Sequence, residues 1–240
     1  MEAERAGRAT AGGAVMGRSD GTGWARQVLG EAGPLLREVL PQLVARAHAA
    51  MAAAHVAGGL ETQHVYGLVW RRTVQEFAEG IPQVVPSARR LKVPHAGYPV
   101  TAVGDVAIYP WRYAKDPVTD PWTARLGDPP SAARRAIMRG VRSTTRQLAL
   151  DLGPPPGGDP GADGEDLFAD GDLPGESEAP AVLVALAELS RTVVVVRYAS
   201  APDALLRVLW GDGRLQDDGT VRGRFGEELT VPPAVRRRAG

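Results

Sequence analysis

The chain has 240 residues, of which 44% are hydrophobic and 5% aromatic, and its 28 basic and 28 acidic residues give a formal net charge of zero. This length and apolar content suffice for a folded core and exclude a wholly disordered protein. The chain has no cysteine, which excludes disulfides, thiolate zinc sites and a cysteine nucleophile. The sequence also has no apolar run of the length of a signal peptide or a membrane span, so we expect a cytoplasmic protein.

The N-terminal part is predicted to be a leader followed by two helical segments. Residues 1–33 are rich in Gly and Ala and lack sustained periodicity, which predicts a disordered leader with at most one short helix near its end. Residues 34–56 are helical in composition, and Pro41 either kinks this helix or begins a second one. The apolar face of residues 61–79 predicts another helix, with Gly80 as its C-terminal stop.

A hairpin, a loop and a helix are predicted next. Strands at 99–103 and 106–111 flank Gly104-Asp105, and a glycine at the first central position suits a tight hairpin turn. Five prolines between residues 110 and 130 predict a loop. Ser131 is then a suitable N-cap for a helix that ends at about residue 150.

The C-terminal part combines a linker with predicted strands. Residues 151–180 hold nine acids, no base and many Pro and Gly residues, which predicts a disordered acidic linker and a domain boundary. Beyond it, the uniformly apolar segment 192–198 predicts a strand buried on both faces, and 204–210 predicts a second strand. Residues 233–240 form a basic tail.

These elements predict an α+β fold. N-terminal helices pack on the hairpin, the arginine-rich helix follows, and the C-terminal strands either complete the same sheet or form a small separate unit. The predicted division is a leader, a helix-helix-hairpin-helix domain, an acidic linker, a β-rich unit and a basic tail, at residues 1–33, 34–150, 151–180, 181–232 and 233–240.

The predicted helix after Ser131 carries a row of arginines. Arg135, Arg139, Arg142 and Arg146 are spaced by 4, 3 and 4 residues and so share one helix face, and no acid lies between residues 129 and 150. Guanidinium groups donate paired hydrogen bonds to phosphates, so the stripe suits an anionic partner. The alternative is a solvated helix face, because only two of the 28 basic residues are lysine and the arginine content is a property of the whole sequence. The adjoining acidic segment either folds back on the stripe or serves as a soluble tether.

Aromatic and basic residues alternate in the predicted loop after the hairpin. Trp111, Arg112, Tyr113 and Lys115 together offer stacking faces beside positive charges, as a base-binding or peptide-binding groove requires. The same residues are equally consistent with a plug that closes a small core under a proline-rich loop.

One enzymatic hypothesis rests on the order of elements. The order helix, strand, strand, helix, strand resembles the core of the restriction-endonuclease-like nucleases, in which an acid at a strand end and an acid-x-lysine pair hold a divalent metal. The resemblance implies Asp105 and Lys115 as catalytic residues, although the residue two before Lys115 is Tyr113 rather than an acid. No other catalytic or cofactor-binding motif is present, and His48 and His55 are seven residues apart rather than at the spacing of zinc ligands on one helix.

The leading functional hypothesis is therefore an accessory or regulatory protein of the cell interior, with no cofactor and no metal. It binds an anionic partner, with nucleic acid as the best candidate, through the arginine stripe and the Trp111 to Lys115 segment. The first alternative is the metal-dependent nuclease. The second is a protein-interaction module in which the stripe meets an acidic protein surface, and whether the protein is an enzyme stays open.

Overall fold

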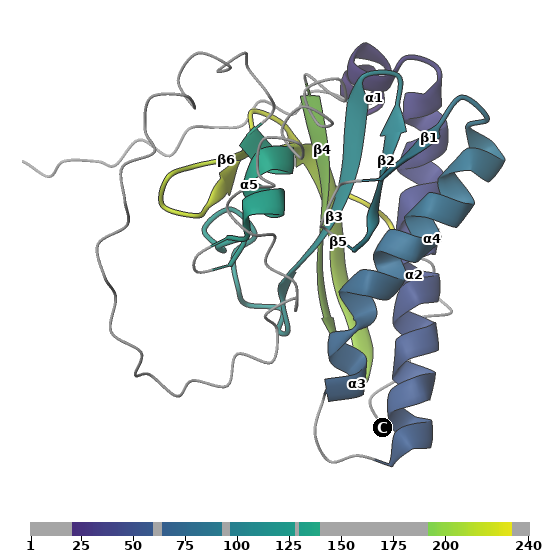
Figure 1. Ribbon diagram of the computed structural model, residues 1–240, viewed down its shortest axis with the longest axis vertical. Helices are drawn as coiled ribbons and strands as arrows, with labels where there is room; N and C mark the ends of the chain where they lie inside the picture. Colours follow the sequence, from purple (N-terminus) through teal and green to yellow (C-terminus); the bar gives the residue numbers. More distant parts are fainter. Residues whose placement is uncertain (1–20, 60–63, 93–96, 128–129, 140–191, 232–240) are drawn as a thin grey trace, which may run out of the picture.

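The computed structural model describes residues 21–59, 64–92, 97–127, 130–139 and 192–231, and a six-stranded mixed sheet forms its centre (Figure 1). The strand order is β1-β2-β3-β4-β5-β8, and neighbours are antiparallel except for the parallel pair β3 and β4. The strands are β1 (Arg89–Lys92), β2 (Pro99–Val103), β3 (Val106–Ala114), β4 (Thr192–Ala201), β5 (Ala204–Asp212) and β8 (Gly226–Glu228). A short hairpin of β6 (Arg214–Leu215) and β7 (Val221–Arg222) lies beside the sheet.

Helices cover both faces of the sheet (Figure 1). One face packs on the N-terminal helices, which are α1 (Gly21–Leu29), α2 (Ala32–Gly58), α3 (His64–Gly67) and α4 (Val69–Val84). The opposite face packs on α5 (Ala132–Arg139) and the β6–β7 hairpin. The combination of helices with a mixed sheet confirms the predicted α+β class.

Strand β4 joins the N-terminal and C-terminal parts of the chain. Val194 and Val196 face the helices α1 to α4, whereas Val193 and Val195 face α5, and all four side chains are buried. This explains the uniformly apolar sequence, because a strand between two covered faces has no solvent side. Since β4 lies between β3 and β5, the C-terminal strands β4, β5 and β8 complete the same sheet as the predicted hairpin.

The predicted leader and the helix predicted at residues 61–79 differ from the structure. From Gly21 onward the predicted leader belongs to the fold, because Trp24 of α1 stacks on Phe225 with ring centroids 4.3 Å apart and meets Trp210 edge-on at 5.3 Å. Gly80 does not end α4, which continues to Val84. A Cβ at Gly80 would collide with the Leu43 side chain of α2, so this glycine serves the close approach of two helices.

Two further predictions concern Pro41 and membrane insertion. Pro41 lies inside α2, which runs continuously from Ala32 to Gly58. Within the described parts of the chain, no helix has the length and apolar character needed to cross a bilayer. The acidic segment 151–180 and the tail 233–240 lie outside the described residues, as does the N-terminal part of the leader.

Candidate functional site

The predicted aromatic and basic loop is the second half of strand β3. Trp111 and Tyr113 are only 6% and 8% exposed and pack on the α5 side of the sheet, while Arg112 points to the opposite face. The prediction of a loop was therefore wrong as far as Ala114, where β3 ends, whereas Lys115 does lie beyond the strand. Of the four residues, Lys115 alone is exposed, so they do not form one binding surface.

The arginine helix begins as predicted. The Ser131 hydroxyl accepts a hydrogen bond from the Arg134 backbone N–H at 3.3 Å, and the Ser131 carbonyl accepts one from Arg135 at 2.9 Å. Ile137 and Met138 anchor α5 to the sheet. The described part of the predicted stripe comprises Arg135 and Arg139 of α5, and Arg142 and Arg146 lie outside the described residues.

Arg134, one residue before the predicted stripe, forms the most informative contact of α5. Its guanidinium carbon lies 5.3 Å from the ring centroid of Trp70, which belongs to α4 and is half-buried. The Trp70 ring meets Tyr98 edge-on at 4.8 Å and Tyr109 at 6.3 Å. We call these four residues the aromatic–arginine patch, which unites side chains from α4, β3, α5 and the residue before β2.

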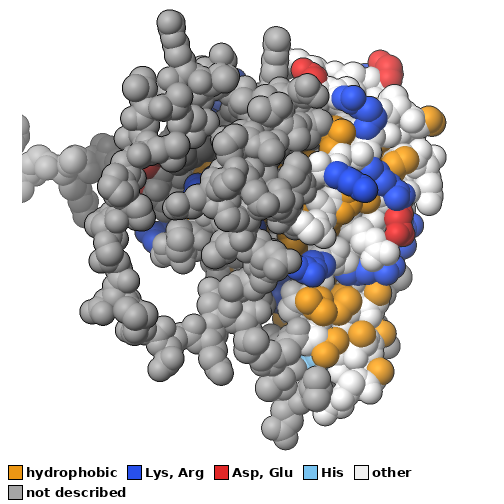
Figure 2. Space-filling model, viewed as in Figure 1, with side chains coloured by type: hydrophobic (Ala, Val, Ile, Leu, Met, Phe, Trp, Pro, Cys, Tyr) orange, Lys and Arg blue, Asp and Glu red, His pale blue; other side chains and the backbone are white. Residues whose placement is uncertain are grey.

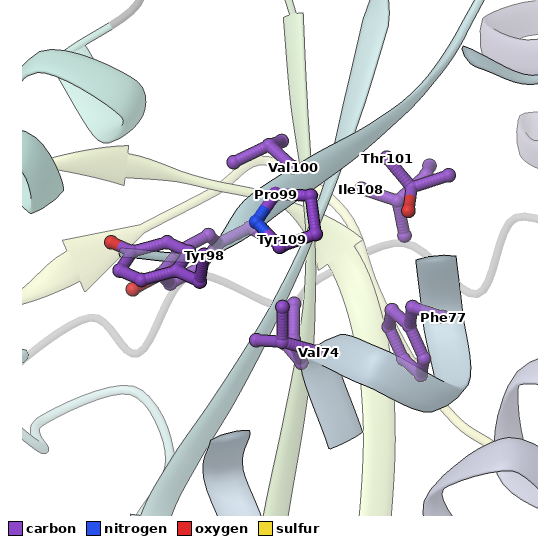
Figure 3. Close-up of a pocket in the computed structure, with 9 residues that line it drawn as sticks. Val74, Phe77, Tyr98, Pro99, Val100, Thr101, Ile108 and Tyr109 are labelled. Carbon is purple, nitrogen blue, oxygen red and sulfur yellow. The ribbon is translucent and has the colours of Figure 1, made fainter. Parts of the chain in front are cut away.

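The patch borders a shallow hollow where β2 and β3 diverge (Figure 3). Strand β2 pairs with β3 only as far as Ile108. Beyond Ile108, the Pro110 carbonyl of β3 accepts a hydrogen bond of 2.8 Å from the Trp70 indole N–H. The hollow has about 210 Å³ of space, continuous with solvent, and Figure 3 shows the two tyrosine rings on one side of it. Its lining comprises Val74, Phe77, Tyr98, Pro99, Val100, Thr101, Ile108, Tyr109 and Pro110.

A second polar cluster lies on the opposite face of the sheet, between α2, α3 and β4. The His48 Nδ1 and the Tyr66 hydroxyl are 2.7 Å apart, and the Arg112 guanidinium lies 5.0 Å from the Tyr66 ring centroid while it donates to the Ser200 carbonyl at 2.6 Å. Burial lowers the pKa of His48 and raises the pKa of Tyr66, so both groups are held neutral at neutral pH. Nearby, the Thr73 hydroxyl lies 3.1 Å from the Tyr198 hydroxyl. This cluster has the character of a buried structural network.

The residues implied by the nuclease resemblance lie far apart. Asp105 is in the turn before β3 and Lys115 directly follows β3, so the whole nine-residue strand separates them, by about 30 Å. One divalent ion cannot contact both side chains. Among the residues that the structure describes, no three histidines or acids cluster closely enough to hold a metal ion.

Sequence reasoning missed Trp70, Tyr98 and Arg134 as members of one site. The concentration of aromatic residues from Trp70 onward could have indicated this site. However, these residues meet only because β2 diverges from β3. Sequence reasoning also missed Arg197, the single charged residue in the apolar run of β4.

The chain matches no protein-family model, no curated protein and no solved structure. The functional argument therefore rests on the site itself.

Proposed function

We propose that the protein binds nucleic acid with unpaired bases through the aromatic–arginine patch. The observation that carries this proposal is the stacking of Arg134 on Trp70, next to the half-buried Tyr98. Unpaired bases stack on aromatic rings and on guanidinium planes, and a guanidinium also donates to phosphate oxygens. A patch that combines these groups can contact both the base and the phosphate of a nucleotide.

The charge of the surrounding surface supports an anionic partner. Strand β1 and helix α4 carry exposed Arg71, Arg89, Arg90 and Lys92, and Figure 2 shows basic side chains along this side of the molecule. Clustered basic side chains raise the local concentration of a polyanion and speed its association.

The hollow is shallow and open to solvent, so it does not enclose a ligand. A base of a bound strand would therefore stack on the half-buried rings of Trp70 and Tyr98 at the surface, without entering a pocket. A cytoplasmic setting, where such strands occur, belongs to the same proposal.

Cleavage of the nucleic acid is not part of this proposal. The observed order α4, β1, β2, β3, α5, β4 has one strand more between the two helices than the order on which the nuclease resemblance rests. The cross-strand pairs next to the hairpin turn are Thr101 with Ile108, Ala102 with Ala107, and Val103 with Val106, and these side chains supply no carboxylate. Asp105 of the turn is separated from Lys115 by the whole of β3, so the proposal is limited to binding.

Fluorescence anisotropy with the full chain tests the class of partner. The labelled probes are a single-stranded DNA, a single-stranded RNA, a duplex of the same sequence and a poly-glutamate peptide. We expect a single strand to bind more tightly than the duplex, with an affinity that falls as salt rises, by about 0.7 in log–log slope for each phosphate contact. Absence of binding at low salt would refute the proposal, and tighter binding of the peptide would favour the protein-interaction alternative.

A further inference from the structure

Strand β4 carries one charged side chain in its apolar run, and this side chain is completely enclosed. Arg197 follows four valines, and its relative exposure is 0%. It lies on the face that packs against β7 and the segment after β3, because its Nη2 donates to the Val221 carbonyl at 3.1 Å. Fully buried arginines are rare unless a carboxylate or several acceptors surround them.

The surroundings of Arg197 neutralise it incompletely. No ion pair to Arg197 is present within the described residues, and its Nε and Nη1 lack hydrogen-bond partners there. Asp212 is the acid that acts on it electrostatically, but the Asp212 carboxylate accepts the backbone N–H groups of Arg224 and Phe225 at 3.1 and 2.7 Å. Burial lowers the pKa of Arg197 to about 10, so the guanidinium is still protonated at neutral pH. A positive charge with two unused donors is therefore held inside the fold.

Two tryptophans enclose the guanidinium, and one of them is partly exposed. The guanidinium carbon lies 4.4 Å from the Trp122 ring centroid and 6.0 Å from that of Trp111. Trp111 is buried in β3, whereas Trp122 is half-buried in the segment between β3 and α5. That segment contacts the β6–β7 hairpin, since the Leu126 N–H donates to the Gly219 carbonyl at 2.9 Å. The Trp122 ring also packs closely on Gly226 of β8, since a Cβ at that glycine would collide with it.

We propose that Arg197 is the anchor of an oxyanion site, in which a phosphate group accepts the hydrogen bonds of Nε and Nη1 after Trp122 swings outward. A phosphate suits the site because it brings negative charge and several acceptor oxygens to a guanidinium that has no ion pair among the described residues and two nitrogens without an acceptor. Arg197 is separate from the aromatic–arginine patch, so this site does not depend on the proposed nucleic-acid binding.

Thermal unfolding in the presence of inorganic phosphate tests the site, with potassium chloride at matched ionic strength as the salt control. For the wild-type protein we expect phosphate at about ten times its Kd to raise Tm by about 3–6 °C. Arg197→Met should abolish this rise, whereas Arg214→Met, which removes an exposed arginine of the neighbouring hairpin, should retain it. An equal rise in Arg197→Met, or no rise in the wild type, would overturn the proposal.

A second variant covers the case in which Arg197→Met does not fold. Arg197→Lys keeps the charge but loses the guanidinium donors, so we expect a rise in Tm of less than half the wild-type value. An unchanged rise would overturn the assignment of Nε and Nη1.

The source of the phosphate is determined by comparing a 5′-phosphorylated with an unphosphorylated trinucleotide. A larger rise in Tm with the phosphorylated trinucleotide than with free phosphate assigns the site to a nucleic-acid end, and a smaller or equal rise assigns it to free phosphate. A rise of the same size with the unphosphorylated trinucleotide would show that the stabilisation does not come from a terminal phosphate and would overturn this assignment.

Discussion

Replacing Val196 with alanine tests whether the two halves of the chain fold as one unit. Val196 is fully buried at the centre of the sheet, where β4 packs against the N-terminal helices. The substitution removes two methyl groups, worth about 1.6 kcal/mol in transfer free energy, and the cavity left behind raises the cost to about 2–3 kcal/mol. For a folded unit of this size that corresponds to a fall in Tm of about 4–12 °C.

The assay is thermal unfolding followed by circular dichroism at 222 nm together with calorimetry. The described helices all precede β4 in the chain, so their signal reports on the N-terminal half, whereas the substitution lies in the C-terminal half. We expect one transition that shifts as a whole. Val118→Ala is the matched control, because Val118 is 87% exposed and its truncation should change stability by less than about 0.5 kcal/mol. A helix signal that keeps its wild-type midpoint while a second transition shifts would refute the single sheet.

Three further predictions concern the pH dependence, the start of α5 and the contact between α2 and α4. Because burial lowers the pKa of His48, the free energy of unfolding is at its full value above about pH 6.5 and falls as the pH decreases below it, by at most about 1.4 kcal/mol per pH unit. In urea titrations at several pH values His48→Gln should remove that slope, and a slope that persists in the variant would contradict the assignment. Ser131→Ala removes the side-chain cap of α5 and should cost about 1 kcal/mol, which Ser131→Asp should restore in chemical unfolding; equal stability of all three proteins would show that the cap is dispensable. Gly80→Val inserts a side chain against Leu43 and should cost about 1–3 kcal/mol, whereas an increase in Tm would show that the two helices are not in close contact.

The elements with a clear local signal were predictable. The hairpin turn at Gly104 has a φ of 60°, which glycine adopts readily, and Ser131 caps α5 as its position after two prolines indicates. The apolar run of β4 predicted a strand with two covered faces. Each of these depends on a few adjacent residues, which is why sequence patterns report them well.

The extent of β3 was not predictable, because Pro110 reads as the start of a loop. The Pro110 carbonyl faces away from β4, and the N–H of another residue at this position would point to the same side. Because β2 has already diverged from β3 at this point, a proline is tolerated here. Strand β1 was missed because Arg89 to Lys92 is short and mostly charged, as edge strands often are.

For the candidate site, the types of residue could be predicted from the sequence, but not which residues meet. Aromatic and basic residues were expected to act together, but the sequence grouped Trp111, Arg112 and Tyr113, which the pleat of β3 distributes to two buried faces. The residues that meet are Trp70 and Arg134, 64 positions apart. Such contacts follow from the packing of α4 and α5 around β3, which no local pattern contains.

The most direct test of the nucleic-acid proposal is the affinity of Arg134→Met for a labelled single strand, compared with that of Arg26→Met. Both variants lose one positive charge, but Arg26 is an exposed residue of α1, whereas Arg134 stacks on Trp70. We predict that anisotropy titrations at one salt concentration show an increase in Kd of about tenfold for Arg134→Met and of less than about twofold for Arg26→Met. Equal effects of the two substitutions would contradict a specific site at the patch.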